Sequence, residues 1–127
     1  MMEFPDWSNK TVLVVEDEEF TRFFYRKALQ GTGINLLFAE NGAEGMKIAT
    51  ENDQVDCVLM DIRMPRTDGF EATRMIKSVK KDLPIIVQTA YVLSNERLLA
   101  FQSGCDEFIS KPIRLEVLFK ILKKYLG

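Results

Sequence analysis

In the segment Val55-Asp56-Cys57-Val58-Leu59-Met60-Asp61, a short apolar run ends in a single carboxylate. An apolar run of this length is typical of a strand that is buried in a sheet. The residues that follow, Ile62-Arg63-Met64-Pro65 and then Asp68-Gly69, predict a loop rather than an immediate turn. We therefore expect a buried strand that presents Asp61 at its carboxyl end.

Four other short apolar runs also have the length and composition of strands. They are Thr11–Val15, which leads into Glu16-Asp17-Glu18-Glu19; Ile34–Ala39; Pro84–Gln88, which leads into Thr89; and Glu107–Ser110, which leads into Lys111-Pro112. Apolar residues recur at helical spacing between these runs. Strands that alternate with helices predict an α/β fold of the (βα)5 type: a doubly wound, five-stranded parallel sheet with helices on both faces.

Several residues indicate where the helices begin and end. Asn41 and Asp68 each stand three residues before a glutamate, which is the pattern of a capped helix start. The first helix carries Phe20 and Phe24 on one stripe and is expected to stop at Gly31. The last helix places its apolar residues on one face, namely Leu115, Leu118, Phe119, Leu122 and Leu126.

Composition narrows the class of protein. The 127 residues are 46% hydrophobic and carry a net charge of −2, which predicts one soluble globular domain without a nucleic-acid footprint. The two cysteines lack the spacing of a disulfide or zinc site, so we expect a reduced, cytoplasmic environment. No apolar run is long enough to cross a membrane. We expect residues 1–9 to be a tail or a linker remnant and residues 10–127 to form the domain.

The strand ends together predict a chemical site. If the strands are parallel, the carboxylates of Glu16, Asp17 and Asp61 meet the Thr89 hydroxyl and the Lys111 ammonium at one edge of the sheet. Three close carboxylates repel one another, and a hard divalent cation such as Mg²⁺ relieves that repulsion. An ionised carboxylate can attack phosphorus to give an aspartyl phosphate, while a lysine and a hydroxyl neutralise and bind the phosphoryl oxygens.

Each of these residues also has a purely structural interpretation. The acidic run Glu16–Glu19 suits a solvated helix start, and Asp61 suits a turn. Thr89 is an ordinary strand residue, and Lys111 precedes a proline turn. Their coincidence at one edge favours the site over four separate structural explanations.

The sequence contains no histidine. This excludes Ser-His-Asp and Cys-His catalysis, imidazole metal sites and a phosphohistidine on this chain. A phosphoryl group that comes from a histidine must therefore come from another molecule or from another part of a longer protein.

Taken together, the motifs resemble the receiver domain of two-component response regulators over residues 10–126. The resemblance rests on Val15-Glu16-Asp17-Glu18, Leu59-Met60-Asp61-Ile62-Arg63-Met64-Pro65, Asp68-Gly69, Thr89-Ala90 and Lys111-Pro112, in the order and spacing of that family. It implies the sheet order 2-1-3-4-5. It also implies a signalling domain that catalyses only its own phosphorylation and slow dephosphorylation, rather than an enzyme.

The resemblance also assigns roles to residues around the expected metal. Asp61 is the implied phosphoacceptor, and Glu16, Asp17 and Asp61, with the backbone carbonyl of Arg63, are the implied ligands of Mg²⁺ or Mn²⁺. Aspartate is commoner than glutamate at the position of Glu16, whose longer side chain could reach the metal through a water molecule.

The implied phosphoryl contacts and switch lie on the later strands. Lys111 and Thr89 would contact the phosphoryl group, and Thr89 would move toward it together with the aromatic switch Phe108, a position where tyrosine is common. The resemblance further implies a cis peptide bond between Lys111 and Pro112.

The implied partners are a histidine kinase or a histidine phosphotransfer protein, which would phosphorylate the domain. A homodimer through the fourth helix, the fifth strand and the fifth helix is a further expectation. The chain could be a stand-alone regulator or a fragment of a hybrid sensor kinase. On the first helix, Phe23 and Tyr25 flank the apolar stripe, either as part of a docking surface or as peripheral core.

Three other functions compete with this one. A degenerate receiver would bind partners without phosphorylation. A magnesium-dependent phosphohydrolase of the haloacid-dehalogenase type would need an acid where Arg63 stands. A flavodoxin-like module would need a phosphate-binding first loop, and the run Glu16–Glu19 would repel a phosphate.

Overall fold

The computed structural model describes residues 3–64, 67–90 and 94–127. Its main sheet has five parallel strands in the order β2-β1-β3-β6-β7. The strands are β1 (Thr11–Val15), β2 (Asn35–Ala39), β3 (Cys57–Asp61), β6 (Ile85–Thr89) and β7 (Glu107–Ser110). Counted along the chain this is the order 2-1-3-4-5, so the predicted α/β fold and strand order are confirmed.

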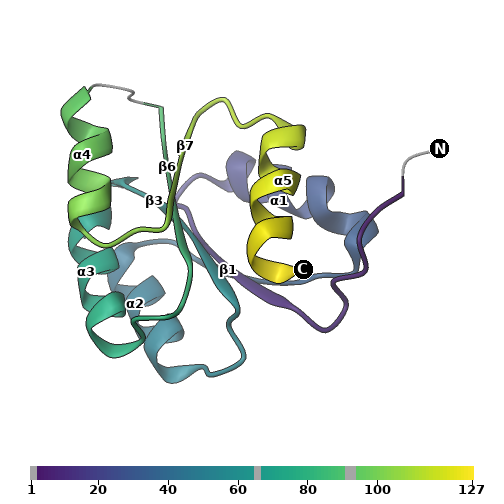
Figure 1. Ribbon diagram of the computed structural model, residues 1–127, viewed down its shortest axis with the longest axis horizontal. Coiled ribbons are helices and arrows are strands. Elements are labelled where there is room, and N and C mark those ends of the chain that lie inside the picture. Colours follow the sequence, from purple (N-terminus) through teal and green to yellow (C-terminus); the bar gives the residue numbers. More distant parts are fainter. Residues whose placement is uncertain (1–2, 65–66, 91–93) are drawn as a thin grey trace.

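Within the described residues, five α-helices cover the two faces of this sheet. They are α1 (Glu19–Leu29), α2 (Gly42–Glu51), α3 (Gly69–Val79), α4 (Ser94–Gln102) and α5 (Leu115–Leu126). Helices α1 and α5 lie on one side, and α2, α3 and α4 lie on the other (Figure 1). Among the described residues, no helix combines the length and the apolar character that crossing a membrane would require.

The packing of the core explains why the sequences of the central strands are continuous apolar runs. Along β1, Val12 and Val14 pack beneath α1 and α5, whereas Leu13 and Val15 pack beneath α2 and α3. Successive side chains of a strand point to opposite faces, so a strand covered on both faces needs apolar residues at every position. The same alternation directs the residue after the strand, Glu16, toward the side of α1 and α5.

The predicted helix starts are confirmed, and the predicted end of the first helix is wrong. The Asn41 side chain accepts a hydrogen bond from the Glu44 amide at 2.8 Å, as its sequence pattern indicated. Helix α1 ends at Leu29, and a 3₁₀ turn (Gln30–Thr32) follows it. The left-handed residue that ends the turn is Gly33, with φ of 72°, rather than Gly31.

A second difference lies just after β3, where the sequence indicated only a loop. A short antiparallel pair of two-residue strands, β4 (Arg63–Met64) and β5 (Thr67–Asp68), forms there. The Asp68 side chain then accepts a hydrogen bond from the Phe70 amide at 2.9 Å and begins α3. Strands of two residues are too short to show a periodic pattern, which is why the sequence did not indicate them.

The segment before β1 packs closely on the last helix. The Trp7 side chain is 1% exposed and its ring stacks on Phe119 with 5.9 Å between the ring centroids. The indole nitrogen of Trp7 donates a hydrogen bond to the backbone oxygen of Gly127 at 3.1 Å. The division of the chain between residues 9 and 10 stays a prediction, but Trp7 belongs to the packed core beneath α5.

Candidate functional site

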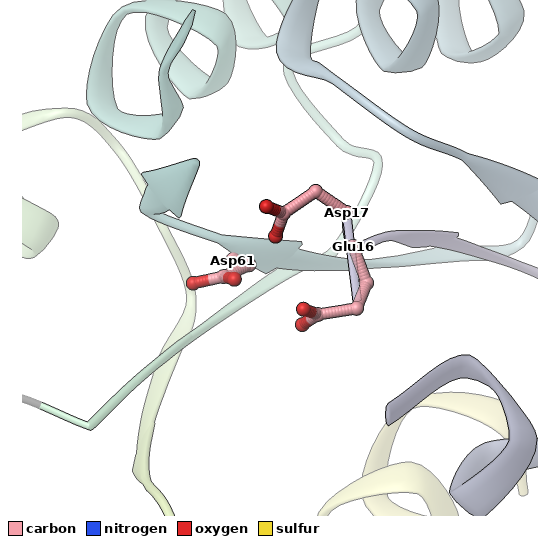
Figure 2. A group of neighbouring side chains, drawn as sticks. All are labelled: Glu16, Asp17 and Asp61. Carbon is pink, nitrogen blue, oxygen red and sulfur yellow. The ribbon is translucent and has the colours of Figure 1, made fainter. Parts of the chain in front are cut away.

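The carboxyl ends of β1 and β3 bring three acidic side chains together. Glu16 and Asp17 follow the last residue of β1, and Asp61 is the last residue of its neighbour β3. One carboxylate oxygen from each of the three lies within 4.8 Å of the others. Figure 2 shows the three carboxyl groups around a common space beyond the strand ends. The predicted clustering of these acids is confirmed, and an all-oxygen set of this kind suits a hard divalent cation.

The backbone around Asp61 is held in place from two sides. The amide of Arg63 donates a hydrogen bond to Asp61 Oδ1 at 3.0 Å. Helix α3 begins at Gly69, where a Cβ atom would lie 2.6 Å from the backbone oxygen of Asp61. A glycine is therefore required for this helix start to approach the strand end so closely.

Lys111 brings a positive charge to the acids. Its Nζ atom lies 3.1 Å from Glu16 Oε2 and 3.4 Å from Asp61 Oδ2. Its backbone amide donates to the Thr89 carbonyl at 2.7 Å, and the bond to Pro112 is cis, as the sequence resemblance implied. Burial lowers the pKa of Lys111, but the Asp61 and Glu16 carboxylates outweigh that effect and leave its pKa raised. The lysine therefore stays charged at neutral pH.

One ammonium does not fully compensate the acidic group. Burial, together with the smaller effect of the nearby Asp61 carboxylate, raises the pKa of Glu16 to about 7 against the opposing effect of Lys111. Burial also raises the pKa of Asp61, against the opposing effects of the Arg63 amide and Lys111. The site thus disfavours ionisation of Glu16 and Asp61, and a bound cation would remove that penalty.

The remaining predicted residues lie near the same edge. Thr89 is buried at the end of β6, where its register partner on β7 is Ser110. Phe108 is half-buried and packs against the apolar cluster that includes Val87 of β6 and Ala100 of α4. The structure therefore brings Thr89 to the strand ends and puts Phe108 against α4, while their roles as switch residues stay predictions.

Sequence reasoning missed a buried polar pair beside Asp61. Tyr25 is fully buried rather than peripheral, and its hydroxyl donates a hydrogen bond to Gln88 Oε1. Gln88 is the register partner of Asp61 on β6. A signal was present in the sequence, because Gln88 is a polar residue at the end of an otherwise apolar strand.

A second missed residue is Glu96 in the first turn of α4. Its carboxylate forms an ion pair with the guanidinium of Arg63. The sequence held no sign of this contact, because an acid in the first turn of a helix is common for its interaction with the helix dipole.

The raised pKa of Glu16 predicts how stability depends on pH. The folded protein binds a proton at Glu16 up to about pH 7, whereas an unfolded glutamate releases it near pH 4.3. Its contribution to stability is therefore full below the unfolded pKa and is lost as the pH rises through about 7. We expect urea unfolding in EDTA to show a loss of about 1–3 kcal/mol between pH 5 and 7.5.

Glu16→Gln should flatten this dependence, since glutamine has no proton to release. The absence of histidine leaves few other groups that titrate in this window. Glu51→Gln, at an exposed position in α2, removes the same charge and should keep the wild-type slope. Equal slopes in wild type and Glu16→Gln would show that Glu16 ionises normally in the folded protein.

Known proteins resemble this chain over almost its whole length. Residues 12–123 match the response regulator receiver domain. The polar-differentiation response regulator DivK of Brucella anthropi is 32% identical over 120 residues, which is 93% of this chain and 97% of DivK.

Two solved structures extend the comparison. One is the receiver domain of a sensor histidine kinase from Pseudomonas aeruginosa with a magnesium ion coordinated in its active-site cleft. Its sequence is 29% identical, and the two structures match with a TM-score of 0.84 over 94% of this chain and 98% of that chain. The other is a co-crystal structure of the histidine phosphotransfer signaling protein Ypd1 with the receiver domain of the response regulator Ssk1 from Saccharomyces cerevisiae. The match has 26% sequence identity and a TM-score of 0.86, and it covers 98% of this chain and 92% of that chain. Together with the strand order and the acidic cluster, the match over residues 12–123 shows that this chain belongs to the response regulator receiver domain family of two-component signalling.

Proposed function

We propose that Asp61 accepts a phosphoryl group from a phosphohistidine in a reaction that needs Mg²⁺ or Mn²⁺. The observation that carries this proposal is the cluster of the Glu16, Asp17 and Asp61 carboxylates with the Lys111 ammonium. A carboxylate oxygen of Asp61 attacks phosphorus, the bond from phosphorus to the donor imidazole nitrogen breaks, and that nitrogen keeps the electron pair. No general base is needed, because the ionised carboxylate is already the nucleophile.

The surrounding residues supply charge and position for this transfer. Glu16, Asp17 and the Arg63 backbone carbonyl are the proposed protein ligands of the cation, with Asp61 itself. When bound, the cation neutralises phosphoryl charge. Lys111 adds a second positive charge, and the Thr89 hydroxyl is the proposed donor to a phosphoryl oxygen. The magnesium ion in the cleft of the Pseudomonas receiver domain supports this choice of cation.

The proposed phosphodonor is a histidine kinase or a histidine phosphotransfer protein. The histidine phosphotransfer protein in the yeast co-crystal structure supports this kind of partner. Beside Lys111, a cavity of about 200 Å³ is lined by Phe20 and Phe24 of α1 and by Pro112. Phe20 is 82% exposed, so an apolar face of a partner helix would bury it next to the site.

The proposed output surface is formed by α4, β7 and α5. Phe108 and Thr89 are the proposed switch residues beneath it, and Leu98 of α4 is an exposed apolar side chain on it. This surface would bind either an effector or a second copy of the chain. These roles hold equally for a stand-alone regulator and for the receiver of a hybrid sensor kinase.

The test of the proposed function is intact-mass measurement after incubation with phosphoramidate or acetyl phosphate. We expect one phosphoryl adduct per chain in the presence of Mg²⁺ or Mn²⁺ and none in EDTA. Hydroxylamine should remove the adduct, because it cleaves acyl phosphates and leaves phosphoserine and phosphothreonine intact. No adduct with either donor or with a phosphohistidine protein would favour a module that binds partners without phosphorylation.

A further inference from the structure

We propose that Glu96 is a positioning residue of the phosphoryl site. Its carboxylate competes with a phosphoryl group on Asp61 for the guanidinium of Arg63. Glu96 holds the guanidinium while Asp61 is unmodified and gives it up when the phosphoryl group is present. The inference rests on the proposed role of Asp61 as phosphoacceptor.

Arg63 connects the two acidic residues directly. Its backbone amide donates to Asp61 Oδ1 at 3.0 Å, and its side chain forms an ion pair with Glu96 Oε1. Arg63 lies in the segment directly after β3, whereas Glu96 lies in the first turn of α4. Helix α4 covers the same face of the sheet as α2 and α3 (Figure 1). One residue therefore links the phosphoacceptor to the start of α4.

The two members of the ion pair differ in their surroundings. The Glu96 side chain is 7% exposed, whereas that of Arg63 is 52% exposed. The second oxygen of Glu96 is buried and, within the described part of the chain, makes no hydrogen bond. A buried carboxylate with one unsatisfied oxygen depends on its counterion, and the loss of that counterion leaves an uncompensated buried charge. The half-exposed guanidinium is the member that can change partner at lower cost.

A phosphoryl group on Asp61 offers Arg63 such a partner. It would place up to two negative charges and three acceptor oxygens beside the Arg63 backbone. The planar guanidinium matches phosphate geometry with two parallel hydrogen bonds. The phosphoryl group and Glu96 thus compete for one cation, and the energy that holds the Arg63–Glu96 pair together opposes the modified state.

The competition has a consequence for α4. If Arg63 turns to the phosphoryl group, Glu96 loses its counterion in a buried position, and moving the first turn of α4 toward solvent would relieve the penalty. Ala100 of the same helix belongs to the apolar cluster against which Phe108 packs. The ion pair would in this way link the modification of Asp61 to the packing of the proposed switch residue.

The test is the affinity for Mg²⁺ and beryllofluoride, a phosphoryl mimic that binds aspartate carboxylates, measured by calorimetry on the full chain. Glu96→Gln should bind roughly three- to tenfold more tightly than wild type, because Arg63 no longer has to leave a carboxylate. In an Arg63→Gln background, the same Glu96→Gln change should have no effect, which a double-mutant cycle measures. Glu51→Gln, at an exposed position of α2, removes the same charge and should bind as wild type does.

The possible results separate the two proposals. Unchanged affinity in Glu96→Gln, or equal tightening with and without the Arg63 guanidinium, would overturn the role of Glu96. Failure of the wild-type protein to bind beryllofluoride would instead contradict the role of Asp61 and with it this inference. Thermal unfolding checks that each variant is folded, and Glu96→Ala removes the same carboxylate if Glu96→Gln does not fold.

Discussion

Asp61→Asn is expected to lose the phosphoryl adduct completely while the domain stays folded. An amide nitrogen or oxygen is a far weaker nucleophile than an ionised carboxylate, so neither phosphoramidate nor acetyl phosphate should modify the variant. Intact mass after incubation with donor and Mg²⁺ measures the effect. An adduct of unchanged size in the variant would show that another residue accepts the phosphoryl group.

The stability of Asp61→Asn in EDTA should equal or exceed that of wild type. Burial raises the pKa of Asp61, which means that the folded state disfavours the ionised carboxylate. Asparagine keeps an oxygen for the Arg63 amide, and Lys111 keeps its contact with Glu16 at 3.1 Å. Because one proposed ligand is gone, added Mg²⁺ should raise the melting temperature less than it does in wild type.

The control is Asp82→Asn, which removes one charge at an exposed position. It should accept the phosphoryl group as wild type does and keep the full response to Mg²⁺. Marked unfolding of Asp61→Asn, with Asp82→Asn unaffected, would show that Asp61 acts as a structural residue of the strand end.

The fold follows from features that are local in the sequence. Strands β1 and β3 are covered on both faces, so they stand out as apolar runs, and Asn41 begins α2 through a hydrogen bond to a residue only three positions away. The burial of Trp7 could not be inferred in this way. Its hydrogen-bond partner Gly127 is 120 residues distant, and only the assembled sheet brings the two together.

The residues of the site also differ in whether local sequence or tertiary contacts determine their positions. Glu16 and Asp17 follow β1, and Asp61 ends the neighbouring strand β3, so parallel pairing alone brings them to one edge. Gln88 and Glu96 depend on tertiary contacts with α1 and with the segment after β3, and no spacing in the sequence specifies such contacts. The charged centre was therefore predictable, whereas the contact partners of Gln88 and Glu96 were not.

Lys111→Met is expected to destabilise the domain by about 3 kcal/mol at pH 8 in EDTA, because it leaves two buried carboxylates without their counterion. The loss should be smaller at pH 5. Burial raises the pKa of Glu16 to about 7 even beside the lysine, so this acid is largely neutral at pH 5 and needs no counterion there. Without Lys111 the pKa values of Glu16 and Asp61 rise further, and the stability of the variant falls more steeply than that of wild type as the pH rises from 5 to 8.

Urea unfolding at pH 5 and pH 8, each with EDTA and with millimolar Mg²⁺, measures both effects. Mg²⁺ should recover part of the loss at pH 8, because a cation among the carboxylates replaces the missing ammonium. Lys47→Met, at an exposed position in α2, replaces a lysine outside the site and should change stability little at either pH. An equal loss at both pH values would mean that Lys111 stabilises the fold through its apolar stem rather than its charge, and the lysine would then no longer support a site built to hold phosphoryl oxygens.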